Sequence, residues 1–245
     1  MTNGSDFYVR ESAARDLLTF RPSCFGTIQA DPPWQFSNRT GKVAPEHKRL
    51  RRYPTMALEE IMELPVARVA KPQAHLYLWV PNALLREGLD VMRRWGFTYK
   101  TNLVWYKIRK DGGPDGRGVG FYFRNVTELV LFGTRGHLRT QQPGRRQVNL
   151  IASCKREHSR KPDELYSIVQ DCSPGPYLEL FARHVRGGWT QWGNEAEVDA
   201  LGTGAALSDV RADHPAAALI YPTARQRGRR RTPSEAPARI VLPLG

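Results

Sequence analysis

Short apolar runs alternate with helix-type patterns along the first 195 residues of the chain. The apolar runs predict buried strands at residues 25–30, 75–80, 100–108, 126–132, 148–152 and 177–181. Helical spacing predicts one helix over residues 55–63 capped by Thr55, another over 83–95, and a third that begins at Pro162. Strands that alternate with helices favour an α/β fold with a mainly parallel sheet and helices on both faces. The ligand site of such a sheet is expected at the carboxyl ends of its strands.

Composition divides the chain near residue 195. Apolar residues make up 40% of the 245 residues and charged residues 25%, values that allow one α/β domain with a sizeable core. Residues 196–245 are rich in Ala, Pro and Arg, which predicts a flexible tail. No stretch is apolar enough to span a membrane, no secretory signal is recognisable, and the three cysteines suit neither a disulfide framework nor a zinc site. We therefore expect a cytoplasmic protein without a metal centre, in which His75 is a core histidine.

The chain is strongly basic. Its 37 Lys and Arg residues exceed its 24 Asp and Glu residues, which gives a formal net charge of +13, and a field of this sign attracts polyanions such as nucleic acid. A basic segment that ends in a tyrosine follows Trp34, and we expect it to contact phosphates and a base. Its members are Arg39, Lys42, Lys48, Arg49, Arg51, Arg52 and Tyr53. Residues 107–120 predict a second lip of the same site, although an ordinary solvated loop fits them as well.

The first predicted strand ends in Asp31, Pro32, Pro33 and Trp34. Two consecutive prolines fix their backbone, so the Asp31 carboxylate and a proline carbonyl can form a rigid pair of acceptors. Trp34 is expected to add a flat stacking surface beside them. The ligand that suits this arrangement is a planar ring with an NH₂ group, whose nitrogen lone pair would be aligned for attack on an electrophile. A strand that simply stops at two prolines is the structural alternative, which the flanking Ala30 and Trp34 disfavour.

With Ala30 before them, these four residues resemble the signature of the MT-A70 family of S-adenosylmethionine-dependent adenine-N6 methyltransferases. Further motifs follow in the family's order, at residues 52–56, 76–80, 95–97, 102–107, 128–133, 158–164, 179–183 and 192–195. The resemblance covers roughly residues 23–195 and is closer to bacterial and phage members than to the eukaryotic messenger-RNA enzyme. It implies that residues 1–195 form a methyltransferase domain with a Rossmann-like class I fold in permuted motif order.

The resemblance also implies a site for S-adenosyl-L-methionine. The residues expected to hold this cofactor are Asp31, Lys161, Glu179, Phe181, Arg183, Asn194 and Glu195. Lys161 is expected near the methionine carboxylate and Asn194 near the ribose hydroxyls. Alternating strand positions would place Glu179, Phe181 and Arg183 on one face. An ordinary ion pair and a core aromatic are the structural alternatives for these three residues.

The expected activity is transfer of a methyl group to the N6 amine of adenine in nucleic acid, with DNA favoured over RNA. Asp31, Pro32, Pro33 and Trp34 are the expected catalytic residues. Because a paired adenine is out of reach, the base must be flipped out or come from a single strand. The alternatives are a non-catalytic nucleic-acid-binding partner of an active methyltransferase, and methylation of RNA adenine or of cytosine N4. A homodimer and a heterodimer are both compatible with the sequence.

Overall fold

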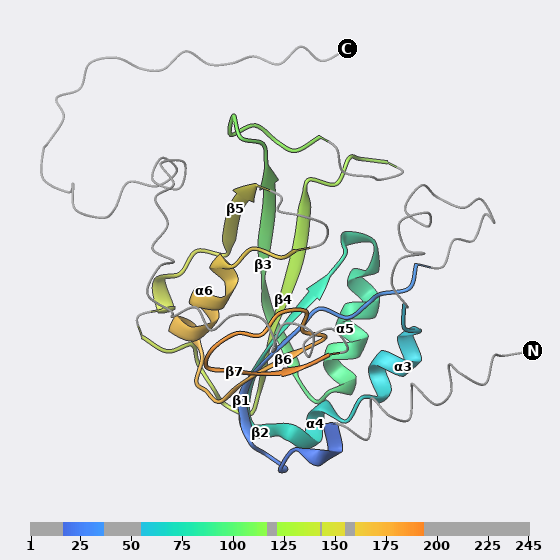
Figure 1. Ribbon diagram of the computed structural model, residues 1–245, viewed down its shortest axis with the longest axis vertical. Helices are drawn as coiled ribbons and strands as arrows, with labels where there is room; N and C mark the ends of the chain where they lie inside the picture. Colours follow the sequence, from blue (N-terminus) through green and yellow to red (C-terminus); the bar gives the residue numbers. More distant parts are fainter. Residues whose placement is uncertain (1–16, 37–54, 117–121, 143, 155–159, 194–245) are drawn as a thin grey trace, which may run out of the picture. The chain divides into compact units, whose positions relative to one another are not determined.

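The computed structural model describes residues 17–36, 55–116, 122–142, 144–154 and 160–193 (Figure 1). Within them a seven-stranded sheet has the order β5-β3-β4-β2-β1-β6-β7. Its strands are β1 (Phe25–Ala30), β2 (Ala70–Val80), β3 (Thr98–Ile108), β4 (Thr127–Arg135), β5 (Leu150–Cys154), β6 (Tyr177–Leu180) and β7 (Trp189–Trp192). The expected domain boundary at residue 195 and the tail that follows it lie outside the described residues.

The sheet is mixed, because β4 runs against the other six strands. Four strand pairs are parallel, and the two antiparallel pairs, β2–β4 and β3–β4, both involve β4. The reason lies in the connection 109–126, whose described residues contain no helix. Parallel neighbours need a crossover that is usually helical, whereas antiparallel neighbours can be joined by a simple loop. The expectation of an α/β fold is confirmed, and that of a mainly parallel sheet is confirmed except at β4.

The strand order reverses beside β1. On one side of β1 lie β2, β4, β3 and β5 in that spatial order, and the chain then returns to the opposite side of β1 to form β6 and β7. In open α/β sheets the ligand crevice lies outside the carboxyl ends of the strands at such a reversal. The ends of β1 and β6 are therefore where a site is expected.

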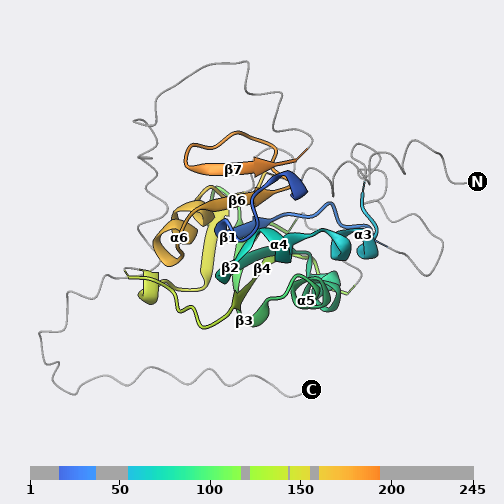
Figure 2. The ribbon, with the colours of Figure 1, turned by 90° about the horizontal axis from the view of Figure 1, so that it is seen from below.

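Helices cover both faces of the sheet, as the sequence predicts (Figure 2). On one face α3 (Leu58–Glu63), α4 (Val66–Val69) and α5 (Leu85–Arg94) pack onto apolar side chains of β1, β2 and β6. On the other face α6 (Glu164–Cys172) packs onto a more aromatic cluster from β2, β3 and β4. Two short 3₁₀ turns, η1 (Asn82–Leu84) and η2 (Gly144–Arg146), complete the described elements. No helix among the described residues is long and apolar enough to cross a membrane.

Two predicted helix starts are wrong by a few residues. The helix expected from Thr55 begins at Leu58, because Ala57 is still extended and its N–H donates to the Glu60 carboxylate at 2.9 Å. The helix expected at Pro162 begins two residues later. The short elements α4 and β7 were not predicted, since four residues are too few to show a period.

His75 is a core histidine, as expected. Its ring is fully buried, with Nδ1 2.8 Å from the Ser173 hydroxyl and Nε2 3.3 Å from the Leu138 carbonyl oxygen. The Tyr77 hydroxyl lies 2.8 Å from the same serine oxygen. Burial lowers the pKa of His75, so the ring is held in its neutral form.

Candidate active site

The Asp31–Trp34 segment leaves the carboxyl end of β1 in a fixed conformation. The backbone N–H of Asp31 donates to the carbonyl of Leu180 in β6 at 3.4 Å, and that of Trp34 donates to the Pro32 carbonyl at 2.8 Å. A further bond, from the Met56 N–H to the Pro33 carbonyl at 2.9 Å, ties the segment to the chain before α3. Both proline carbonyls thus already accept one hydrogen bond, and each retains a second lone pair.

Trp34 anchors this segment. Its side chain is 6% exposed and belongs to the core cluster beneath α3, α4 and α5. A buried indole N–H needs an acceptor, and the Trp79 carbonyl provides one at 2.9 Å. The expectation that Trp34 offers an open stacking surface is therefore wrong for this structure, because its ring is enclosed.

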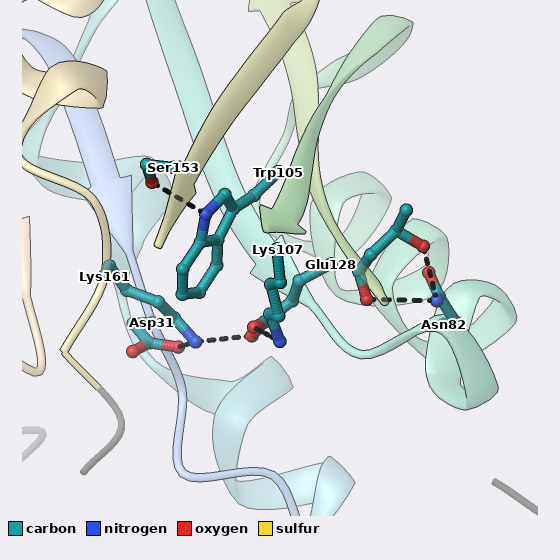
Figure 3. Close-up of polar contacts among 8 residues, drawn as sticks. Asp31, Asn82, Trp105, Lys107, Glu128, Ser153 and Lys161 are labelled. Atoms are coloured by element: carbon teal, nitrogen blue, oxygen red, sulfur yellow. Dashed lines mark hydrogen bonds and ion pairs between the residues drawn. The ribbon is translucent and has the colours of Figure 1, made fainter. Parts of the chain in front are cut away.

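Four side chains of alternating charge extend from Asp31 across the sheet edge (Figure 3). Lys161 Nζ lies 3.2 Å from Asp31 Oδ1 and contacts Glu128 Oε1, while Lys107 Nζ lies 2.8 Å from Glu128 Oε2. We call these four residues the charge chain. The Asp31 side chain is 31% exposed, whereas the other three are between 15% and 17% exposed. Asp31 is thus the end of the charge chain that is open to a ligand.

The electrostatics of the charge chain keep its middle ionised. Burial opposes the charge on Glu128, but Lys161 and Lys107 outweigh it and lower the pKa of this carboxyl to about 2. Burial likewise opposes the charge on Lys161, yet Asp31 and Glu128 raise the pKa of this ammonium above its ordinary value. For Asp31 the balance differs: burial raises its pKa, and Lys161 offsets this in part.

Two indoles fix the lysines of the charge chain from one side. Lys161 Nζ lies 4.9 Å from the Trp79 ring centre, and Lys107 Nζ lies 4.7 Å from that of Trp105. The two rings meet edge to face at 6.0 Å, and the Trp105 N–H donates to Ser153 at 3.0 Å. Each ammonium therefore has an aromatic face as well as a carboxylate, which restricts its position.

At the end of β6 the side chains of Glu179 and Phe181 do not lie on one face, as alternating strand positions would have placed them. The Glu179 carboxylate accepts a 2.5 Å hydrogen bond from the hydroxyl of Tyr166 in α6. Phe181 follows the last strand residue and has φ +64°, so its ring turns to the opposite face and packs against Trp192 at 5.4 Å. A left-handed residue breaks the period of two, and these side chains therefore do not share a face. Arg183 lies close enough to Asp31 to lower the pKa of that carboxyl.

The remaining predicted site residues lie outside the described residues. They are Arg39, Lys42, Lys48, Arg49, Arg51, Arg52, Tyr53, Asn194 and Glu195. Among the described residues no group of three or more His, Cys, Asp or Glu side chains could hold a metal ion.

Glu128 and Tyr166 are site residues that sequence reasoning missed. The signal for Glu128 is a carboxylate at the start of an apolar strand run, just as Lys107 stands near the end of another. Both residues face the same edge because Trp105 and Glu128 are partners in the antiparallel β3–β4 register. Tyr166 gives no such signal, since a tyrosine on an amphipathic helix is ordinarily part of the core.

The sequence of this chain is similar to those of known proteins. The MT-A70 family model matches residues 25–195. An MT-A70-like protein of Medicago truncatula is 33% identical over 189 residues, which are 74% of this chain and 28% of that protein. The type II methyltransferase M.MunI of Mycoplasma sp is 27% identical over 187 residues, which are 70% of this chain and 77% of M.MunI. The human N(6)-adenosine-methyltransferase catalytic subunit METTL3 is 27% identical over 177 residues, which are 71% of this chain and 28% of METTL3.

The residues matched by the family model include the seven strands described above and all four residues of the charge chain. The chain spans little more than a quarter of the length of the plant and human relatives, but about three quarters of M.MunI. Because the matched residues make up well over half of the sequence, this chain belongs to the MT-A70 family.

Proposed function

We propose that this chain transfers the methyl group of S-adenosyl-L-methionine to the N6 amine of adenine in nucleic acid. The observation that carries the proposal is the fixed Asp31-Pro32-Pro33 segment at the end of β1, whose carboxylate is open to a ligand. It stands where the strand order reverses, the place where α/β sheets hold their ligands. The Rossmann-like class I character of the fold, in permuted motif order, belongs to the same proposal.

Asp31 and a proline carbonyl position the amine in this mechanism. The carboxylate accepts one N6 hydrogen, and the second lone pair of the Pro32 or Pro33 carbonyl accepts the other. The nitrogen lone pair is thereby directed at the electrophilic methyl group that the bound cofactor supplies. As the N–C bond forms and the S–C bond breaks, the nitrogen becomes positively charged and must release one proton. We assign that proton to Asp31, because burial raises the pKa of its carboxyl.

The described residues fit the cofactor's polar groups. Two carboxylates already contact the Lys161 ammonium, which has three donors, so one N–H is left for the carboxylate of a methionine moiety. At the end of β6 the Glu179 carboxylate lies on one face, where it can accept hydrogen bonds from hydroxyl groups. The Phe181–Trp192 pair lies on the other face, where it can pack against a flat ring. Asn194 and Glu195 remain candidates for the ribose.

We infer DNA as the substrate before RNA. M.MunI, whose length the chain covers most fully among the relatives described above, is named a type II methyltransferase, and the resemblance of this chain to bacterial and phage members favours DNA. METTL3 is named an adenosine methyltransferase, and the chain spans 28% of it. The net charge of +13 supports a polyanionic substrate of either kind.

The test is methyl transfer from labelled cofactor to DNA and RNA, each single- and double-stranded, followed by nucleoside mass spectrometry. The wild type should form N6-methyladenine on DNA. Asp31→Ala should lose at least about a hundredfold in kcat, as expected when a reacting amine is misplaced. Asp90→Asn, which removes a carboxylate of α5 that is 32% exposed and pairs with Arg93 at 2.7 Å, is the matched control.

Three results would contradict parts of the proposal. Full activity of Asp31→Ala would remove the positioning mechanism. Formation of N4-methylcytosine would mean that the enzyme methylates the amine of cytosine and not that of adenine. A folded chain that binds nucleic acid without binding the cofactor would identify a non-catalytic partner subunit instead.

A further inference from the structure

Two adjacent aromatic rings stand in solvent on the connection between β3 and β4. Tyr122 is 95% exposed and Phe123 is 85% exposed, the highest values among the large apolar side chains described. Each such ring presents roughly 150–250 Å² of surface that favours burial. A neighbouring pair on an otherwise well-packed sheet therefore marks an interaction surface.

The rings lie at the same sheet edge as the charge chain. The base of the connection is fixed at Lys107, whose N–H donates to the Val126 carbonyl at 2.7 Å and whose carbonyl accepts from the Asp115 N–H at 2.8 Å. Phe123 is four residues before Thr127, the first residue of β4, so it reaches at most about 14 Å from that edge. Figure 1 shows the connection at the carboxyl end of β3. The aromatic pair thus lies on the connection at the sheet edge where Asp31 is presented.

Among the described residues of the connection, exposed cations outnumber exposed carboxylates. Arg124 follows the two rings directly, and Lys110 on the other arm of the connection is also exposed. Arg109 is 51% exposed and forms an ion pair with Asp111 at 2.9 Å, while Asp115 is buried. An apolar protein partner would have to desolvate these cations, whereas a nucleic-acid strand offers both phosphates for the cations and ring faces for the aromatics.

We propose that Tyr122 and Phe123 form a stacking platform for unpaired bases beside the target adenine. The inference rests on the proposed function, because an adenine within reach of Asp31 must be flipped out or single-stranded, which leaves neighbouring bases without a stacking partner. Aromatic side chains replace that partner without regard to base identity. The platform therefore contributes affinity and substrate position, and base recognition comes from elsewhere.

The test measures the dissociation constant for a fluorescent single-stranded DNA that contains one adenine. Tyr122→Ala with Phe123→Ala should weaken binding by about 5- to 150-fold for each base that loses its stacking partner. The exchange variant, Tyr122→Phe with Phe123→Tyr, keeps both rings and should bind as the wild type does. The salt dependence of binding should keep its slope in all variants, because no phosphate contact is removed.

A second DNA, with abasic sites on both sides of the adenine, tests the stacking itself. The wild type should lose affinity for this DNA, while the double alanine variant should bind both DNAs equally. Equal losses for wild type and variant would overturn the proposal. So would a variant that loses affinity only because a dimer of the chain dissociates, as judged by light scattering, since the rings would then form a protein interface.

The binding assay is independent of methyl transfer. A wild type that shows the stacking pattern but forms no methylated base would contradict the proposed reaction and leave the platform standing. Cofactor binding by the double alanine variant should be unchanged, which separates loss of the platform from loss of the fold.

Discussion

Replacing Glu128 with Gln removes the central charge of the charge chain and keeps the shape of the side chain. In the wild type the two carboxylates and two ammonium groups balance. In the variant Lys161 keeps only the Asp31 carboxylate and Lys107 loses the carboxylate that it contacts, so two largely buried cations lose their common partner. The expected result is a loss of stability with the fold retained.

Two independent routes give the magnitude. The surroundings lower the pKa of Glu128 from 4.5 to about 2, and at about 1.36 kcal/mol per pKa unit this corresponds to about 3 kcal/mol. Removing one partner of a buried ion pair costs about 3–5 kcal/mol in general. Because the lysine and glutamate side chains of the charge chain keep 15–17% exposure, the lower figure of about 3 kcal/mol applies.

The assay is a double-mutant cycle by urea unfolding at pH 7, with Lys107→Met as the second change. Each single variant leaves the charge chain unbalanced, whereas the double variant restores neutrality around Asp31 and Lys161. The double variant should therefore be more stable than the sum of the single losses predicts, by about 1–3 kcal/mol. Simple additivity of the two losses would refute the reasoning, because it would mean that the charges do not act as a unit.

The Glu128→Gln variant should also change how the stability of the protein depends on pH. The folded-state pKa of Glu128 lies below its unfolded value of 4.5, so its stabilisation is fully present above about pH 4.5 and is lost as the pH falls toward 2. The stability gap between wild type and Glu128→Gln should shrink from pH 5 to pH 3. A gap that stays constant over this range would show that the loss comes from packing.

Further predictions concern the frame around the site. Burial lowers the pKa of His75 below 6.5, so wild-type stability should be full above about pH 6.5 and fall as the pH drops below it, whereas His75→Gln should flatten that slope in thermal melts. Gly26→Ala would place a Cβ 2.6 Å from a backbone carbonyl oxygen and should cost about 1–3 kcal/mol in urea unfolding. Gly116→Ala, which meets nothing within 4 Å, should be tolerated and serves as its control. Trp34→Phe leaves a buried carbonyl of β2 without its donor and should lower the unfolding free energy by about 1–3 kcal/mol; an unchanged value would remove its anchoring role.

The strands could be predicted from the sequence because buried strands must be apolar. The run 25–30 coincides with β1, whose residues are all buried, and the other five predicted runs differ from their strands by one to five residues at an end. What the pattern could not predict is the backbone of single residues. Phe181 adopts a left-handed φ that sequence reasoning assigns to glycine or asparagine, and this residue overturned the expected face of the cofactor segment.

The charge chain could be predicted only in part, for a different physical reason. Asp31 and Lys161 are recognisable from their motifs, but the carboxylate that joins Lys161 to Lys107 depends on strand register. Sequence separation gives no hint of that register: Glu128 lies 33 residues from Lys161 and 21 from Lys107. Burial is the second reason. A largely buried carboxylate such as that of Glu128 needs cations beside it, and which cations lie there depends on the fold.

The reversed direction of β4 is what brings Glu128 to the site. The other strands present their carboxyl ends at this edge, and a parallel β4 would present Arg135 there and carry Glu128 to the far edge. Because β4 runs the other way, its first residues meet the last residues of β2 and β3, and Asn82 fixes that junction by donating to Thr127 at 3.0 Å (Figure 3). The departure from a parallel sheet thus supplies the carboxylate that balances Lys161. A change that shifts the β3–β4 register by one residue should remove Glu128 from this face and leave Lys107 and Lys161 without their common carboxylate.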